Sequence, residues 1–406
     1  MKIAVIGAGA SGIIAALQAT YAGAEVTLIE RNQTVGRKLL VTGSGRCNIS
    51  NQNVKADKYD CADKAWLGRV FDLFGVSDTM KMFKKLGILV YQTDDGWYYP
   101  LSNSAQSVVA ILSDALAAAN VEQLLSCRVE TIYRHDRYFV VKYHHSGSNE
   151  KRQFDRVIIA TGGKAYPTLG STGDLFPVLE RLGHTVIPKR PALAPVQVEL
   201  GVFNTLQGVR LDSGVTVWDH DYKLASSAGN LIFTEYGVNG PPVMDVSHHI
   251  SALPGRALEL SLNPLEFYQQ QISELLTQKR CTQFSVSSLL SAFLPPKVVQ
   301  LYLKLAKLDD NCRLCELDDS TLEHLISLLQ DVRFPVKGVR GFTYCQLSAG
   351  GVPVSEVEPT TMASRLIEGL YLVGETLDVV GPCGGYNLQF AFSSGAIAGK
   401  SAAKNP

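Results

Sequence analysis

The chain has 406 residues, of which 46% are hydrophobic and 19% are charged, a composition that is typical of folded globular proteins and excludes a disordered or collagen-like chain. Lys and Arg together number 38, and Asp and Glu also number 38, so the formal net charge is zero. Because a neutral chain has no general attraction for polyanions, we expect no nucleic-acid partner. The length predicts two or three domains.

The first thirty residues predict a strand, a helix and a second strand. Residues 3–6 form an apolar run rich in β-branched side chains, which suits a buried parallel strand. Residues 13–21 fit a helix, and residues 25–29 fit a second strand. Glycines interrupt this stretch and no A-x-A-like cleavage site follows, so neither a signal peptide nor a membrane span is predicted. We therefore expect a cytoplasmic protein without a membrane partner.

Three glycines between the first strand and the helix follow the pattern G-x-G-x-x-G. Gly7 permits the tight turn, Gly9 lets the backbone approach a pyrophosphate, and Gly12 lets the helix pack close to the sheet. The helix N-terminus offers N–H groups to phosphate oxygens. Glu30 closes the second strand 18 positions after Gly12, where a carboxylate can accept hydrogen bonds from ribose hydroxyls. Because this carboxylate would repel a 2′-phosphate, FAD or NAD is expected rather than NADP.

Residues 31–51 form a second glycine-rich stretch, RNQTVGRKLLVTGSGRCNISN. Its glycines let backbone amides face an anion, and Arg37, Lys38 and Arg46 can offset phosphate charge. A basic surface loop is the alternative, but the position directly after the ribose-binding acid favours a cofactor role. Cys47 is a candidate neighbour of the cofactor's reactive ring, although a small buried residue is the simpler interpretation.

Two helical segments and four strands are predicted next, at residues 62–86, 104–119, 122–125, 127–135, 138–144 and 157–159. The first helical segment is expected to break at Gly75. The last strand is followed by a tight turn, Ala160–Gly163, which we expect to return to the first glycine loop because ligands of a doubly wound sheet bind at the carboxyl ends of its strands. The glycine-rich and hydroxyl-rich stretch that continues to Asp174 resembles a cofactor-covering loop.

Three prolines, Pro188, Pro191 and Pro195, predict a crossover into a second domain. Short β-type runs alternate with turns over residues 196–262, and an amphipathic helical pattern with many leucines covers residues 264–330. The predicted division is a first cofactor-binding segment, a β-rich insert, a helical insert subdomain and a second cofactor-binding segment, at residues 1–190, 191–262, 263–334 and 335–406.

The last fifty residues predict a second strand–turn unit at the same binding edge. Residues 370–373 form a buried strand that ends at Gly374-Glu375, and Asp378 follows shortly after. Asp378 could hold the ribityl hydroxyls of a cofactor larger than NAD. A terminal unit that only closes the sheet is the alternative, but the spacing complements the N-terminal site.

Gly384 and Gly385 precede a helix that begins at Tyr386 or Asn387. This provides a second helix N-terminus near the predicted binding edge. The backbone amides at Asn387 and Leu388 are expected to face the pyrimidine edge of a flavin.

These stretches together resemble the BaiN/YhiN-like FAD-dependent oxidoreductases, a family within the two-dinucleotide-binding-domain flavoproteins. The runs GRKLLVTGSGRCN at 36–48 and GGYNLQFAFSSG at 384–395 are specific to the family, and the similarity covers nearly the full length. The resemblance implies an α/β fold in which both chain ends form a Rossmann-like FAD-binding domain, with an inserted β-rich and helical domain. It also implies non-covalent FAD.

Two segments depart from the family pattern. Glu235 and Asn239 stand where the family usually has His and Ser, and Trp97-Tyr98-Tyr99 replaces the usual Arg-Val-Phe. If these positions face the substrate, the substrate of another family member does not transfer to this chain.

We predict a FAD-dependent oxidoreductase that exchanges hydride between flavin N5 and a small organic substrate, as an enone-type reductase or as an amine or ketone oxidase. NAD(P)H is a candidate transient electron donor. Tyr386, Arg340 and Cys383 are the candidate catalytic side chains. The alternatives are a FAD-dependent RNA-modifying enzyme, which the neutral charge disfavours, and a non-enzymatic flavin-binding redox sensor. The substrate, electron donor and acceptor and oligomeric state stay open.

The predicted cofactor-binding residues come from these turns and from the strand at 127–135. They are Gly7, Gly9, Ala10, Ser11, Gly12, Glu30, Arg31, Lys38, Gly43, Ser44, Gly45, Arg46, Asn48, Val129, Thr161, Gly162, Gly374, Glu375, Asp378, Gly385, Asn387 and Leu388. Eight cysteines, Cys281 among them, are scattered along the chain, and we expect reduced thiols. Cys312 and Cys315 have the spacing of a redox or metal pair but lack a second pair nearby, so no metal site is predicted.

Overall fold

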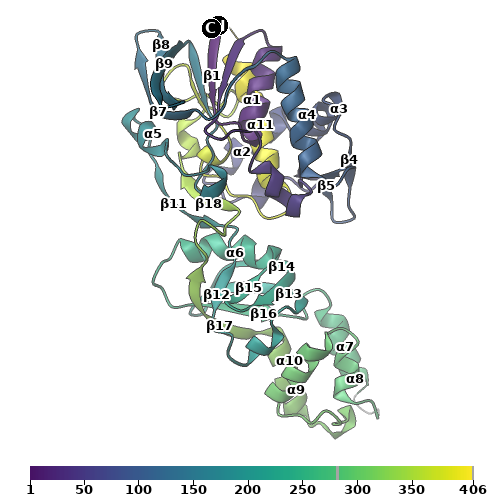
Figure 1. Ribbon diagram of the computed structural model, residues 1–406. Coiled ribbons are helices and arrows are strands. Elements are labelled where there is room, and N and C mark those ends of the chain that lie inside the picture. Colours follow the sequence, from purple (N-terminus) through teal and green to yellow (C-terminus); the bar gives the residue numbers. More distant parts are fainter. Residues whose placement is uncertain (280–282, 405–406) are drawn as a thin grey trace. The chain divides into compact units, whose positions relative to one another are not determined.

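The computed structural model describes residues 1–279 and 283–404, so Cys281 lies outside the described residues (Figure 1). The chain divides into two compact units. The first consists of Met1–Arg190 together with the chain from Gln346 onward, and the second consists of Pro191–Cys345. Both ends of the chain therefore belong to one unit.

A five-stranded parallel sheet forms the centre of the first unit. Its strands in spatial order are β19 (Leu370–Leu372), β10 (Arg156–Ile159), β1 (Lys2–Ile6), β2 (Glu25–Ile29) and β6 (Glu122–Leu124). Their apolar side chains are almost all buried, as expected for a parallel sheet that is covered on both faces. The fold class expected from the sequence, an α/β Rossmann-like domain built from both chain ends, is confirmed.

Two helices from opposite ends of the chain pack against each other, α1 (Ala10–Tyr21) and α11 (Tyr386–Ala402), shown in purple and yellow in Figure 1. Glycines permit the close approach. A Cβ atom on Gly395 would lie 2.3 Å from the carbonyl oxygen of Ser11, and one on Gly399 would lie 2.3 Å from that of Ala15. These contacts leave no room for a side chain, so small residues of α11 join the C-terminal segment to the N-terminal one.

The remaining elements of the first unit surround this sheet. They are β3 (Ser50–Asn51), α2 (Lys64–Leu73), α3 (Val76–Lys85), β4 (Val90–Gln92), β5 (Trp97–Pro100), α4 (Ala105–Ala118), β7 (Arg128–His135), β8 (Tyr138–His145), β9 (Ser148–Phe154), α5 (Phe176–Arg181), β11 (Ile187–Ala192) and β18 (Leu347–Gly351). The predicted helix break at Gly75 is confirmed, because this residue separates α2 from α3. Strand β9 was not predicted, because its sequence SNEKRQF is mostly polar and exposed.

The second unit contains a closed antiparallel barrel. Its strands are β12 (Val196–Val198), β13 (Arg210–Asp219), β14 (Tyr222–Thr234), β15 (Gly237–Asn239), β16 (Leu258–Asn263) and β17 (Val332–Val339). Pairing of β12 with β17 closes it. The sequence placed residues from 335 onward in the second cofactor-binding segment, whereas β17 pairs within the barrel and the chain returns to the first unit only at Gln346.

Helices complete the second unit. They are α6 (Pro241–Ser251), α7 (Gln269–Gln278), α8 (Val286–Leu290), α9 (Pro296–Leu305) and α10 (Asp319–Gln330). Helix α6 begins with Pro241 and Pro242, which suit the first turn of a helix because its N–H groups need no partner within the helix. The sequence had indicated only a turn there. The barrel and the leucine-rich helices share one apolar core. None of the helices in the described ranges is long and apolar enough to cross a membrane.

Candidate functional site

The predicted binding turns follow neighbouring parallel strands, β19, β10, β1 and β2, at their carboxyl ends. Such strand ends lie along a single edge of the sheet. The topology therefore brings together turns that are far apart in the sequence, and this edge of the first unit is the candidate site.

The three glycines of the first turn have different surroundings. A Cβ on Gly7, whose φ is +101°, would lie 2.5 Å from the carbonyl oxygen of Ala160. A Cβ on Gly12 would lie 1.8 Å from the carbonyl oxygen of Gly7. These two glycines are required by packing, and the predicted return of the Ala160–Gly163 turn to this loop is confirmed. A Cβ on Gly9 would meet no atom within 4 Å, so the space beside this backbone is open to a ligand.

Glu30 is buried and supports the glycine turn. Its Oε2 accepts a hydrogen bond of 2.7 Å from the backbone N–H of Ala8. Its Oε1 accepts hydrogen bonds from the backbone and the side-chain amide of Asn32, at 2.8 and 2.7 Å. This support of the glycine turn by the Glu30 side chain was not predicted from the sequence. The ribose contact remains a prediction, since each carboxylate oxygen can accept more than one hydrogen bond.

The loop predicted to cover the cofactor is fastened beside the end of β2. The Arg31 guanidinium bonds to Thr172 and lies 3.2 Å from a carboxylate oxygen of Asp174. The Asn32 amide donates to the carbonyl oxygen of Leu169 at 3.1 Å. Val129, another of the predicted cofactor-binding residues, lies on strand β7 and is buried.

A partly buried ion pair links the two chain segments. Lys38 Nζ lies 2.8 Å from Glu375 Oε2, and the other carboxylate oxygen of Glu375 accepts 2.8 Å hydrogen bonds from the backbone N–H and the hydroxyl of Ser348. Asp378 accepts a 2.7 Å hydrogen bond from the backbone N–H of Gly350. The structure thus brings three predicted residues together, but their side chains already bind protein partners.

Lys189 joins this cluster and was not predicted. Its amine donates to the carbonyl oxygens of Gly350 at 2.6 Å and Glu375 at 3.2 Å, and it lies over the ring of Phe176. Burial lowers the pKa of Lys189 to about 8, against the opposing effect of the neighbouring carboxylates. The glycine run that follows Ser348 is the sequence feature from which this cluster could have been predicted.

The turn before α11 packs on the second glycine-rich stretch. Gly384 and Gly385 have φ values of +102° and +93°, and a Cβ on Gly385 would lie 2.4 Å from the carbonyl oxygen of Ser50. The side chain of Asn387 accepts from the backbone N–H of Gly381 and donates to its carbonyl oxygen, both at 2.8 Å. Asn387 therefore shapes the turn with its side chain, which leaves its backbone amide for the predicted flavin contact.

An acceptor without a partner lies beside this turn. Asn48 is buried, and its Oδ1 accepts no hydrogen bond in the described part of the protein. A Cβ on Gly385 would lie 2.8 Å from this oxygen. Because buried polar atoms are nearly always hydrogen-bonded, this oxygen fits a donor supplied by a ligand. With the open space at Gly9, it makes the residues present compatible with a bound dinucleotide cofactor.

Gly374, Gly43, Ser44 and Gly45 occupy the remaining predicted turns. A Cβ on Gly374 would lie 2.7 Å from the hydroxyl of Ser11, so the C-terminal turn meets the first turn of α1. Gly43, Ser44 and Gly45 have consecutive positive φ values of 56°, 57° and 83°. This left-handed backbone turns the chain sharply.

Cys47 is fully buried, and burial raises the pKa of its thiol to about 11. A thiol with such a pKa is a poor nucleophile at neutral pH, so the structure favours the packing interpretation.

Two of the three candidate catalytic residues belong to the first unit and one belongs to the second. Cys383 lies on the turn before α11, and Tyr386 is the first residue of that helix. The Tyr386 ring is buried edge-on to Tyr59, with 5.8 Å between ring centroids. Arg340 belongs to the second unit, where its guanidinium lies between the rings of Tyr344 and Tyr236.

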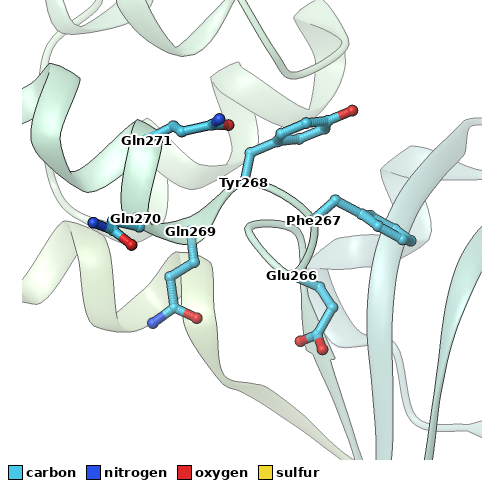
Figure 2. Close-up of a pocket in the computed structure, with 6 residues that line it drawn as sticks. All are labelled: Glu266, Phe267, Tyr268, Gln269, Gln270 and Gln271. Atoms are coloured by element: carbon cyan, nitrogen blue, oxygen red, sulfur yellow. The ribbon is translucent and has the colours of Figure 1, made fainter.

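A hollow of about 390 Å³ lies in the second unit between β16 and α7 (Figure 2). Its lining includes the exposed rings of Phe267 and Tyr268 and a run of glutamines. None of the predicted site residues lines it, so it is not the candidate site. No group of three or more His, Cys, Asp or Glu in the described ranges could hold a metal ion.

Residues 1–401 match the model of the HI0933-like protein Rossmann domain. The chain belongs to this HI0933-like family. It is 34% identical to the 3-dehydro-bile acid delta(4,6)-reductase of Clostridium scindens, with all of both chains covered. It is 30% identical to the ribosomal RNA dihydrouridine synthase of Escherichia coli, with 96% of this chain and 95% of the relative covered. The expected family and the expected oxidoreductase class are confirmed.

Two solved structures share the fold of this HI0933-like chain at low identity. The 3-ketosteroid delta1-dehydrogenase of Sterolibacterium denitrificans is 13% identical, with 99% of each chain covered and a TM-score of 0.55. The 3-ketosteroid-delta4-(5alpha)-dehydrogenase of Rhodococcus jostii RHA1 is 15% identical, with 99% of this chain and 96% of that chain covered and a TM-score of 0.50.

Proposed function

We propose that this protein is a FAD-dependent reductase of a carbon–carbon double bond conjugated to a carbonyl group. The names of the two curated relatives, a 3-dehydro-bile acid delta(4,6)-reductase and a dihydrouridine synthase, both describe the saturation of such a bond in a ring. This shared chemistry supports the reaction class without selecting either substrate.

The observation that carries the cofactor proposal is the open space at Gly9, within a turn whose other two glycines are required by packing. A pyrophosphate needs this close approach of the backbone, and the first turn of α1 offers it unpaired N–H groups. At the other end of the site, Asn48 offers an acceptor to the pyrimidine edge of the flavin. When bound and reduced, FAD supplies the hydride that, with one proton, saturates the double bond.

The chain's own residues then position the cofactor and deliver the proton. The Lys38–Glu375 pair holds the two cofactor-binding segments together. Tyr386, the first residue of α11, and Cys383, on the turn before it, are the proposed proton donors to the α-carbon of the substrate. NAD(P)H is the proposed electron donor, and it would bind transiently, because the chain has no second G-x-G-x-x-G for a separate nicotinamide domain.

Gly9→Ala tests the cofactor site. The new methyl group meets no protein atom, so the variant should fold normally and bind FAD at least tenfold more weakly because the methyl occupies the pyrophosphate's space. Gly68→Ala is the matched control, since its Cβ would also meet nothing and it lies in α2. FAD titration and circular dichroism measure both effects. Unchanged FAD affinity in Gly9→Ala would overturn the proposed site.

Anaerobic reduction of the FAD-loaded protein tests the reaction. Rapid bleaching by NADH or NADPH, followed by reoxidation with a conjugated cyclic enone but not with the saturated ketone, is the expected result. A flavin that no conjugated enone reoxidises would overturn the reaction class.

A second candidate substrate is a uracil ring in RNA, which the name of the relative from Escherichia coli favours. The chemistry would be the same, but Lys and Arg only equal Asp and Glu in number, so phosphate contacts would have to come from a local basic patch. RNA affinity measured against salt concentration distinguishes this candidate, because a substrate RNA gives a steep slope.

A further inference from the structure

Three aromatic rings lie in a row on the small sheet of β3, β5 and β4. Trp97 and Tyr99 are two residues apart on β5 and so share a face, and Tyr91 pairs with Tyr99 across the sheet. The ring centroids of Trp97 and Tyr99 are 6.3 Å apart, and those of Tyr91 and Tyr99 are 6.2 Å apart. We call these three residues the aromatic row.

The aromatic row touches two of the proposed flavin-binding turns. A Cβ on Gly384 would lie 3.0–3.2 Å from three atoms of the Trp97 indole, and a Cβ on Gly43 would lie 3.2 Å from the Tyr99 ring. The Asn51 amide, on β3, donates to the carbonyl oxygen of Gly384 at 3.0 Å. The row is therefore held at the start of α11, beside the buried acceptor of Asn48.

Trp97 differs from the other two tryptophans in its hydrogen bonding. The indole N–H of Trp66 donates to the carbonyl oxygen of Val357 at 2.7 Å, and that of Trp218 donates to the Ser261 hydroxyl at 2.9 Å. The half-buried indole of Trp97 donates to no acceptor in the described ranges. This N–H is not among the buried unpartnered polar atoms of the described residues, so it is accessible to solvent.

A cation lies over Tyr99, the central ring of the row. The Arg46 guanidinium is exposed and lies over the Tyr99 ring, with 4.4 Å from Cζ to the ring centroid. Its nearest hydrogen bond to a side chain is to the Tyr99 hydroxyl at 3.3 Å, and it pairs with no acidic side chain of the described chain. Tyr99 is buried, so the accessible apolar surface of the row comes from Trp97 and Tyr91, which are partly exposed.

We propose that Trp97 is the specificity-determining residue for a flat cyclic enone, which stacks on the indole ring. This rests on the proposed function, since the row faces a substrate only if the Gly384 and Gly43 turns hold the flavin. The stack selects rings over open chains because only a planar ring covers the indole face.

The test uses the FAD-loaded full chain and two variants, Trp97→Phe and Trp97→Leu. The probes are 2-cyclohexen-1-one and the open-chain enone 3-penten-2-one, whose binding is followed by the change in flavin absorbance. Trp97→Leu should weaken 2-cyclohexen-1-one about tenfold and the open-chain enone much less, with flavin occupancy unchanged. Trp97→Phe keeps an aromatic ring of smaller area, so its affinity for 2-cyclohexen-1-one should lie between those of wild type and Trp97→Leu. Trp218→Phe, in the barrel, is the control and should bind both enones like wild type.

Equal affinity of wild type and Trp97→Leu for 2-cyclohexen-1-one would overturn the role of Trp97 alone. Loss of flavin from both Trp97 variants would also overturn it, because the ring would then only support the Gly384 turn. A wild-type protein that binds the cyclic enone tightly but never reduces it would overturn the proposed function and leave the binding role standing. If neither enone binds, both proposals fail.

Discussion

The interiors of the two units differ in kind. Among the described residues, fifteen of nineteen buried polar residues belong to the first unit and four to the second. Those of the first unit form networks that hold loops, as when Gln389 bonds to Ser50, Thr79 and Ser393 beneath the start of α11. The second unit is a barrel and helices around apolar side chains. Hydrogen-bonded interiors fix the positions of turns, whereas apolar interiors mainly provide stability.

The two units also carry opposite charge. Residues 191–345 contain 12 Lys and Arg against 16 Asp and Glu, and the rest of the chain contains 26 against 22. Although the total charge is zero, the first unit, which contains the candidate dinucleotide site, is basic, and the insert is acidic. An acidic insert repels a polyanion, so it is the less suitable part of the molecule for binding RNA.

The largest expected loss of stability comes from a substitution that disrupts the packing of α11 on α1. Gly395→Leu places a side chain where the backbone of α1 lies 2.3 Å from the Cβ position. We expect a loss of about 3 kcal/mol or more in the stability of the first unit, because neither backbone can move without disturbing the sheet. Flavin release on heating measures it, with Gly68→Ala as the control. If Gly395→Leu released its flavin at the same temperature as wild type, the close packing of α1 on α11 would be contradicted.

Phe334→Ala tests whether the second unit is independent. Its ring is buried and packs edge-on to Phe203, with 4.9 Å between ring centroids. The cavity should destabilise the barrel by about 3–5 kcal/mol. Because the two cores are separate, flavin should stay bound while the fluorescence of Trp218, which lies in the barrel, reports earlier unfolding in urea. Simultaneous loss of flavin and barrel would contradict two separate interiors.

A smaller, pH-dependent effect is expected at His184, which is buried between Glu356 and Ser364, at 2.7 and 3.0 Å. Burial acts to raise the pKa of Glu356, but hydrogen bonds from Thr185 and His184 outweigh it and hold the pKa below its ordinary value. Because the folded-state pKa is depressed, this stabilisation is present above the unfolded-state pKa and is lost as the pH falls through the folded-state pKa. Thermal unfolding between pH 6 and pH 3 measures the loss.

Glu356→Gln is the matched comparison for this pH dependence. The amide cannot titrate, so the unfolding temperature of the variant should fall less steeply with acid than that of wild type. Equal slopes would show that other carboxyl groups dominate the acid transition.

The smallest effect is expected at the cysteine pair of the insert. Cys315 is exposed, and burial raises the pKa of the Cys312 thiol, which lowers its reactivity. The double variant Cys312→Ser with Cys315→Ser should change stability by less than about 0.5 kcal/mol and leave flavin reduction unchanged. Stoichiometric zinc in the wild-type protein that disappears in the variant would contradict this.

Local patterns accounted for much of the first unit. The G-x-G-x-x-G turn lies between β1 and α1, Gly75 separates α2 from α3, and the strand at 157–159 became β10. Each depends on residues that are neighbours in sequence, because strand and helix periodicity and glycine turns act over a few residues. Strand β9 and helix α6 were missed, because the one is a polar edge strand and the other begins with prolines that also mark turns.

The sequence by itself determined the family, the cofactor class to expect and the strands that carry the binding turns. Only the tertiary structure decided that β12 closes the barrel on β17, that Lys38 pairs with Glu375, and that Asn48 keeps an unpaired buried oxygen beside the turn before α11. The physical reason is range. Propensities and turn chemistry act between neighbours in the chain, whereas pairing, burial and hydrogen-bond satisfaction depend on which distant residues the fold brings into contact.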